Sequence, residues 1–461
     1  MGWRTRSLFR AWCVVVATGL SLPGAAPQAG APVDGRIKTL TQAYNASGQQ
    51  LFGQFAASSG NVVFSPYSIG AAMAMALAGA RGATQTEMLS ALQQKLSPPE
   101  INAANADALA VLGGYDKSAM APDCPQPSTF SGGQCEAPMP TSGSCPFPLK
   151  PSGDKCVGPP AERPSAKVAV ANALMQTPGA PPVADEYKAL LERDYAAEAF
   201  HDVQLADVNG WVSRKTEGKI DRILSQPLLD KATVLLNAVY FKAHWRSRFL
   251  VSATRDDAFH LDGSHSVQTP TTHQTERLAL VRQPDFRAVA LPYDVGGVEM
   301  VVVLPDAVEG AAAVARSLDA PQLNALFAAL QAADSERVDL ALPKFTTRFA
   351  ADHVEAAFQR LGMVKAFKRD EADFSGVTGQ PVEKAKMWID QIVHHAMIDV
   401  MEGGTEAAAA TAVVTVFAVR DSRPPPPPTP FHVDHPFLFY VLEETTGAIL
   451  FQGRIVDPRQ S

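Results

Sequence analysis

The decisive stretch of this sequence reads Glu402-Gly403-Gly404-Thr405-Glu406-Ala407-Ala408-Ala409-Ala410-Thr411-Ala412-Val413-Val414-Thr415-Val416-Phe417-Ala418-Val419-Arg420. Its two halves favour different structures. The run Ala407–Ala410 favours a helix, whereas Val413–Phe417 is β-branched and aromatic and favours a strand. Because local conflicts of this kind concentrate at functional sites, we interpret the stretch as a functional segment.

A strand made from this stretch would have an unusually small face. Side chains alternate between the two faces of a strand, so Thr405, Ala407, Ala409 and Thr411 would share one side. Such a strand could enter a packed sheet without a clash. Gly403-Gly404 supplies a hinge before it, and Pro424–Pro428 ends strand pairing after it. We predict a loop that can become a central strand of roughly 40 Å. The alternative is a disordered Ala/Pro linker.

Composition restricts the class of protein. The chain has 461 residues, 46% of them hydrophobic, which is enough for a sizeable core. Its net charge is −7 and its 40 Lys and Arg form no basic stripe, so we expect no nucleic-acid partner. Helices predominate early and strands later, which predicts one α+β domain rather than a doubly wound sheet.

The N-terminus has the pattern of an export signal. In residues 1–26, three arginines precede the apolar run Ala11–Leu22 and the small residues Gly24-Ala25-Ala26. Cys13 lies within this segment but lacks the preceding residues typical of a lipid anchor. No later stretch approaches ~20 apolar residues, so we expect no membrane span. We predict a secreted protein, periplasmic if the source is a Gram-negative bacterium, with its main domain at residues 35–461.

The other four cysteines lie in one segment. Cys124, Cys135, Cys145 and Cys156 occur within residues 115–164, which are rich in Pro, Gly and Ser. An even count in an exported chain predicts two disulfides, with three possible pairings. A zinc site is disfavoured because the segment has no C-x-x-C spacing and no His. We predict an inserted, cross-linked surface loop that either decorates the surface or binds a partner. Decoration is favoured because neither charge nor aromatic residues concentrate there.

The order of elements follows from periodicity and capping residues. The expected helices are 42–57, 66–80 with Ser65 as its cap, 84–92, 98–112, 184–195, 205–220 and 353–361. The expected strands are 61–64, 167–175, 234–241, 286–291, 298–304, 338–342, 387–400, 437–442 and 448–455.

Catalytic signatures are missing from the sequence. It contains no G-x-S-x-G, H-E-x-x-H or phosphate-binding glycine loop, so we predict no enzymatic activity and no cofactor. The ten His residues show no metal spacing apart from the pair His394-His395. Adjacent residues on a strand point to opposite faces, so we interpret one of the pair as a hydrogen-bonded core histidine and predict no metal site.

Several separated motifs together resemble the serpin family. They are Asn61–Ile69, Asn237–Trp245, Leu342–Phe345, Ala372–Gly376, Glu402–Ala410, His435–Phe439 and Gly453–Pro458. Their order and spacing also fit. The resemblance covers Ile37 to Pro458 apart from residues 115–164.

This resemblance implies a fold of three β-sheets and about nine helices with an exposed reactive-centre loop. A serine protease attacks the loop and forms an acyl-enzyme. The cleaved loop then inserts into the central sheet and deforms the protease before deacylation. The uncleaved fold must store the energy that insertion releases, so it is held kinetically.

The resemblance also assigns residues. Ser65, Ser68, Asn237 and His394 match a buried polar cluster beneath the point where the sheet opens, and Trp245 matches the aromatic residue where insertion begins. Without the resemblance, the two serines would be capping residues and Trp245 a core residue. Residues Glu402–Ala410 match the hinge of the loop.

The resemblance assigns the scissile bond less directly, because two ways of counting along the sequence disagree. The residue that is acylated lies sixteen positions after Glu402 in the family pattern, which selects Ala418, followed by Val419. Alanine there suits an elastase-like protease. Counting back from Pro436 disagrees by about seven residues, which leaves Phe417 and Arg420 as alternatives.

Three functions remain open. The first is suicide inhibition of an extracellular serine protease, elastase-like or chymotrypsin-like, by a monomer that forms a covalent acyl complex. The second is inhibition of a papain-like cysteine protease. The third is a non-inhibitory carrier or chaperone. The small residues from Thr405 to Ala410 favour inhibition, because insertion requires them.

Overall fold

The computed structural model describes residues 35–56, 60–116, 124, 128–131, 134–141, 143–145, 149–158, 166–224, 226, 231–351, 354–405 and 426–460. The expected signal segment, residues 1–26, lies outside these ranges. None of the helices in the described part combines the length and the apolar composition needed to cross a membrane.

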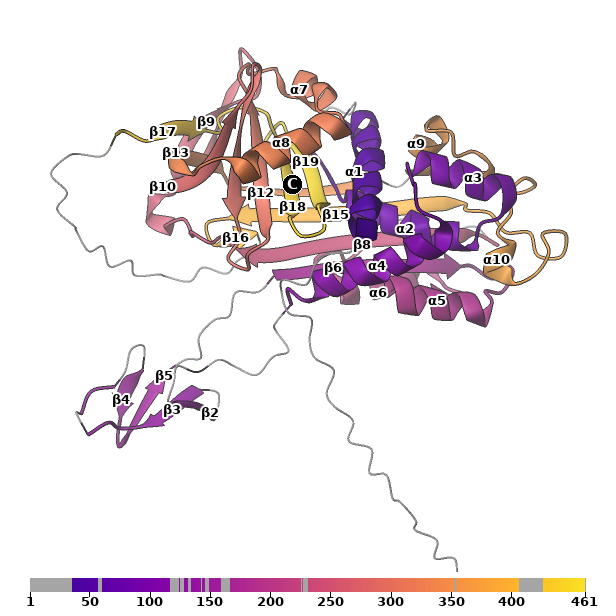
Figure 1. The fold of residues 1–461 in the computed structure, drawn as a ribbon, viewed down its shortest axis with the longest axis horizontal. Helices are drawn as coiled ribbons and strands as arrows, with labels where there is room; N and C mark the ends of the chain where they lie inside the picture. Colours follow the sequence, from indigo (N-terminus) through magenta and orange to yellow (C-terminus); the bar gives the residue numbers. More distant parts are fainter. Residues whose placement is uncertain are drawn as a thin grey trace, which may run out of the picture.

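A six-stranded sheet forms the centre of the molecule, and its long strands run side by side in Figure 1. Its strands in spatial order are β14 (Phe345–Ala351), β15 (Gln391–Met401), β16 (Gly404–Thr405), β8 (Thr233–His244), β6 (Ala166–Gln176) and β7 (Glu198–Phe200). Below the two-residue strand β16, β15 and β8 pair directly and parallel, from Gln391 opposite Val234 to Met397 opposite Tyr240. The sheet is therefore closed along most of its length and divided only at one end.

Two further sheets share one long strand. The second sheet has the order β1 (Val62–Phe64), β19 (Ala448–Ile455), β18 (Phe437–Glu443), β12 (Val298–Pro305), β11 (Phe286–Pro292) and β10 (Ser266–Arg282). The third contains β9 (Arg255–His260), β10, β13 (Glu336–Pro343) and β17 (Thr429–His432). Strand β10 pairs with β11 through Ala279–Arg282 and with β13 through Thr271–Leu278. The expected three sheets are present, two of them joined through β10.

Helix α2 (Pro66–Gly79) packs against both large sheets, where it contacts β6, β8 and β19. Thirteen of its fourteen residues are buried, so it shows no polar face. The Ser65 side chain caps it by accepting a hydrogen bond from the Ser68 backbone N–H. This position brings the start of α2 against the middle of the central sheet.

The other helices cover the outer surfaces. They are α1 (Gly35–Phe55), α3 (Gly82–Ala91), α4 (Pro98–Gly113), α5 (Asp185–Tyr195), α6 (Leu205–Lys215), α7 (Ala311–Ser317), α8 (Ala320–Ala332), α9 (Val354–Arg360) and α10 (Ser375–Thr378), with short 3-10 turns η1 (Val251–Ala253) and η2 (Lys365–Phe367). The prediction that a helix extends to residue 220 is wrong, because α6 ends at Lys215. There Thr216 Oγ1 bonds back to the Val212 carbonyl, and Glu217 and Gly218 take positive φ angles of 53° and 75°.

The cysteine-rich segment has strands of its own, which corrects the expectation of a plain loop. The strands β2 (Thr129–Ser131), β3 (Gln134–Pro138), β5 (Lys155–Gly158) and β4 (Lys150–Ser152) form a four-stranded sheet. Of the three pairings left open, the structure has Cys124–Cys135 and Cys145–Cys156. Cys135 and Cys156 are fully buried in a small core of their own, in which disulfides compensate for scarce aliphatic residues.

Candidate functional site

The predicted hinge begins inside the central sheet. In β16, Thr405 pairs antiparallel with Val400 of β15 on one side and with Ala243 of β8 on the other. Gly404 pairs in the same way with Met401 and His244. The second hinge glycine and the first residue of the small-faced stretch therefore already form a short strand between β15 and β8.

Gly404 allows this insertion because it has no side chain. Its φ is +147°, and a Cβ built there would lie 2.1 Å from the Ala243 carbonyl oxygen and 2.6 Å from the His244 Cα. Both obstacles are backbone atoms that cannot rotate away. The glycine predicted as a hinge is therefore also the residue that permits the close approach of its own backbone to that of Ala243 and His244.

Glu402 fixes the chain just before this strand. Its carboxylate accepts hydrogen bonds from Lys344 Nζ at 3.0 Å and Thr254 Oγ1 at 2.9 Å, and its backbone carbonyl accepts one from the Phe249 N–H at 2.9 Å. Burial alone would raise the pKa of Glu402, but the hydrogen bonds and the charge of Lys344 outweigh it and lower that pKa. Glu402 is therefore an ionised anchor that joins three segments of the chain.

Trp245 lies at the end of the sheet that contains β16. Its indole Nε1 donates to the Met401 carbonyl at 2.9 Å, and its backbone N–H donates to the Gly403 carbonyl at 3.0 Å. Its ring stacks on Tyr293, with centroids 4.5 Å apart and planes 13° from parallel. Trp245 thus holds both sides of the turn that enters β16.

The predicted polar cluster lies farther down, where α2 meets the closed part of the sheet. His394 of β15 and Asn237 of β8 are opposite each other in the parallel ladder, and both are buried. The Ser65 N–H donates to His394 Nε2 at 3.2 Å, so the ring proton resides on Nδ1 and is donated to Asn237 Oδ1. Burial lowers the pKa of His394 to about 3, and His395 adds to the shift, so the ring is neutral at physiological pH.

Asn237 is the centre of the cluster. Its amide nitrogen, which has two hydrogens to donate, lies within hydrogen-bond distance of the carbonyl and hydroxyl oxygens of Ser68 and, at 2.6 Å, of Asn172 Oδ1. Asn172 lies opposite Asn237 in the β6–β8 ladder, and its role was not predicted from the sequence. The available signal was a lone amide within the otherwise apolar residues 168–175. The structure places Ser65, Ser68, Asn237 and His394 in one hydrogen-bonded cluster, and their role in sheet opening stays a prediction.

Truncation at this centre should destabilise the fold strongly. Asn237→Ala leaves the His394 Nδ1–H and Asn172 Oδ1 buried without their partner, and we expect a loss of about 3 kcal/mol. Thermal unfolding measures the change. Asn324→Ala on the exposed face of α8 is the control and should stay within about 0.5 kcal/mol of wild type. Equal melting temperatures for the two variants would contradict this role of Asn237.

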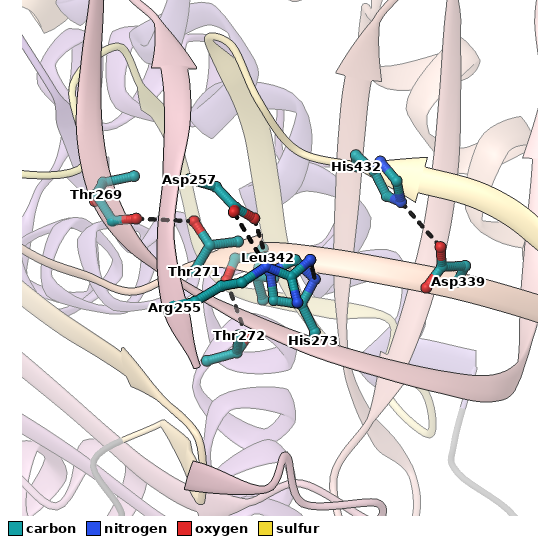
Figure 2. A network of polar contacts seen from close by, with 9 residues as sticks. All are labelled: Arg255, Asp257, Thr269, Thr271, Thr272, His273, Asp339, Leu342 and His432. Atoms are coloured by element: carbon teal, nitrogen blue, oxygen red, sulfur yellow. Dashed lines mark hydrogen bonds and ion pairs between the residues drawn. The ribbon is translucent and has the colours of Figure 1, made fainter. Parts of the chain in front are cut away.

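The chain after the predicted loop is anchored at an edge of the third sheet. Strand β17 pairs parallel with β13, and the His432 Nε2 lies 3.1 Å from Asp339 Oδ2 across this pair. Figure 2 draws this contact. On the neighbouring strands, His273 Nε2 lies 2.7 Å from Asp257 Oδ2, and Arg255 also contacts both residues (Figure 2). The intervening segment is thus held at both ends, by β16 and by β17.

Part of the predicted site lies outside the described residues. The hinge residues Glu406, Ala407, Ala408, Ala409 and Ala410, and the candidate reactive-bond residues Phe417, Ala418, Val419 and Arg420, all belong to 406–425. In the described part of the chain, no group of three or more His, Cys, Asp or Glu side chains is arranged to hold a metal ion.

A serpin-type fold is defined by three features: the three sheets, the buried helix α2, and the short strand β16 between β15 and β8. A family model described as "Serpin (serine protease inhibitor)" matches residues 42–124 and 151–458, so this chain belongs to the serpin family. Serpins are protease inhibitors rather than enzymes, although some members do not inhibit.

Individual relatives agree with this assignment. An uncharacterized serpin-like protein of Thermococcus kodakarensis is 32% identical, over 92% of this chain and 87% of its own length. Leukocyte elastase inhibitor of Sus scrofa is also 32% identical, over 59% of this chain and 73% of its own length. Human thyroxine-binding globulin, solved in complex with its ligand, aligns with a TM-score of 0.72 over 92% of this chain and all of its own, but at 23% identity it supports the fold alone.

Proposed function

We propose that the protein is a suicide-substrate inhibitor of an extracellular serine protease with elastase-like or chymotrypsin-like specificity. The observation that carries this proposal is β16, because its pairing on both sides gives a preformed start for a new central strand. The likeness to leukocyte elastase inhibitor supports the elastase-like class.

The chemistry begins at the bond between Ala418 and Val419. The serine hydroxyl of the protease attacks the Ala418 carbonyl carbon and forms an ester. The peptide bond breaks, and the proton from the hydroxyl passes to the new amino group of Val419. Water would normally hydrolyse the ester and free the protease. Phe417 and Arg420 are the alternative acylated residues.

The register of β16 indicates where the freed segment would go. Continued past Thr405, the antiparallel pairing places Ala407 between Ile398 and Phe241, Ala409 between Ala396 and Val239, and Thr411 between His394 and Asn237. All six of these sheet residues are buried, so this face of the new strand meets a packed core. Small residues at 407 and 409 therefore fit, and the Thr411 hydroxyl arrives at the level of the polar cluster.

Insertion also explains how the acylated protease would be held before deacylation. The direct pair His394–Asn237 would be separated by a strand, and their hydrogen bond would need new partners such as Thr411. From Thr405 to Ala418, thirteen residues of strand span roughly 44 Å, so the acylated residue would move beyond the far end of β15. The attached protease must travel with it, and compression against the body of the inhibitor distorts its catalytic site before water can complete hydrolysis.

A panel of proteases tests the proposal. Wild-type protein is mixed with pancreatic elastase, chymotrypsin, trypsin and papain, and denaturing gels are searched for a covalent complex. We expect a complex with elastase or chymotrypsin, with mass spectrometry placing the ester on Ala418. Ala418→Glu should abolish complex formation with elastase, whereas Arg420→Gln should leave it unchanged. Cleaved chain and fully active protease throughout the panel would overturn the inhibitor function.

Two alternatives correspond to other outcomes. A complex with papain alone would indicate inhibition of cysteine proteases. No complex, together with reversible ligand binding, would indicate a carrier, and thyroxine-binding globulin, solved in complex with thyroxine, is a serpin-fold protein that binds a small ligand. Export remains part of our proposal, and the two disulfides support it because they persist in oxidising compartments. We also propose that the inhibitor acts as a monomer without nucleic-acid or membrane partners.

A further inference from the structure

We propose that Tyr293 is a positioning residue that keeps Thr405 in the sheet, so that insertion grows from an existing strand rather than starting anew. The inference rests on the proposed function, and it concerns what controls the first step. Tyr293 follows β11 in the second sheet, yet its hydroxyl lies 2.7 Å from Thr405 Oγ1 in the central sheet. Both residues are completely buried.

The tyrosine ring is held on several sides. It stacks on Trp245 and meets Phe241 edge-on, with centroids 5.1 Å apart. Its backbone N–H donates to the Val298 carbonyl at 2.9 Å. A ring fixed in this way presents its hydroxyl at one place, and Thr405 occupies that place.

The position of this hydrogen bond matters because Thr405 is the last residue of β16, and the predicted hinge residues 406–410 follow it. Withdrawal of Thr405 would break its pairing with both neighbouring strands and leave the buried Tyr293 hydroxyl without its partner. Starting a strand between two paired strands is costly, whereas each further residue replaces one part of the β15–β8 ladder with hydrogen bonds on both of its sides. The Tyr293–Thr405 contact therefore removes the costly first step, which favours insertion over deacylation.

The experiment uses Tyr293→Phe, Thr405→Val and the double variant, each of which removes a hydroxyl with little change of shape. The matched control is Tyr440→Phe, because Tyr440 is also fully buried and its hydroxyl has no partner among the described residues. Hydrogen exchange of the peptide containing Gly404 and Thr405 reports withdrawal, as does the rate of cleavage after Glu406 by a glutamate-specific endopeptidase.

We expect both rates to rise at least fivefold in each single variant, with no further rise in the double variant. Tyr440→Phe should match wild type. Wild-type rates in Tyr293→Phe, or additive effects in the double variant, would overturn the role of Tyr293. These measurements need no target protease, so they can succeed even if the inhibitor function fails. If elastase is trapped, the single variants should also consume at least twice as much inhibitor per protease molecule.

Discussion

Ala409→Arg is expected to turn the protein from an inhibitor into a substrate. On insertion, continuing the register of β16 would direct this side chain toward the buried core between Ala396 and Val239. An unpaired guanidinium there costs several kcal/mol, so insertion should slow by roughly a hundredfold while acylation at Ala418 proceeds. The measurement is the number of inhibitor molecules consumed per protease molecule, which should rise roughly tenfold or more.

Glu406→Arg is the matched control, because it introduces the same side chain on the opposite face of the inserted strand. If the same register continued on insertion, residue 406 would lie between exposed Lys242 and half-buried Asp399 on the outer side of the sheet. The arginine can reach water there, so inhibition should persist with less than a threefold change. Equal loss of inhibition in both variants would mean that the strand does not insert in this register.

The alternation of side chains along single segments made much of the fold predictable. The apolar runs that became β8, β12, β18 and β19 were found to within a few residues, as was α2 with its Ser65 cap. Helix α7 was missed because it is short and its alanine-rich sequence carries little periodic contrast. Helix α8 was also missed, although its buried residues Leu323, Leu326, Phe327 and Leu330 follow helical spacing after the Asp319 cap. The strands of the cysteine-rich segment were missed because disulfides rather than aliphatic side chains form their core.

The candidate site also contains residues that local sequence marks and residues that only the fold brings together. Glycine and small residues before and within the hinge are local features, so Gly404 and Thr405 were predictable from the sequence. Lys344, Asn172 and Tyr293 contact the hinge or the polar cluster only after distant strands come together. The lone amide in residues 168–175 marks Asn172 as unusual but does not name its partner, and no local pattern marks Tyr293. The extent of insertion before cleavage is a balance of packing energies, which the sequence alone does not reveal.

Glu299→Gln is expected to stabilise the protein above pH 7. Glu299 of β12 is 7% exposed, and its Oε1 has no hydrogen-bond partner among the described residues. Burial raises its pKa to about 7, and the charge of Glu444 adds to the shift while Arg246 opposes it. Its neighbours in the sheet, Pro292 and Leu442, offer no charge.

The direction of the pH effect follows from proton binding. Between pH 4.5 and about 7 the folded state holds the Glu299 proton and the unfolded state does not. The contribution of this proton to the free energy of unfolding is therefore complete below pH 4.5 and is lost as the pH rises through 7. The loss amounts to about 3 kcal/mol. Glu299→Gln removes it, so the variant should exceed wild type by about 2 to 3 kcal/mol at pH 8 and match it at pH 4.5.

The contribution of His394 to the free energy of unfolding changes with pH in the opposite direction, which gives a second measurable difference between the variant and wild type. Its folded pKa of about 3 lies below the unfolded value of 6.5, so its contribution to stability is lost as the pH falls below 6.5. Between pH 4.5 and 6.5 the two groups offset each other in wild type. Glu299→Gln should therefore show a steady loss of about 1.4 kcal/mol per pH unit on acidification from 6.5, where wild type is nearly flat. Parallel unfolding profiles for the two proteins, measured from pH 4.5 to 8, would show that Glu299 does not titrate in this range.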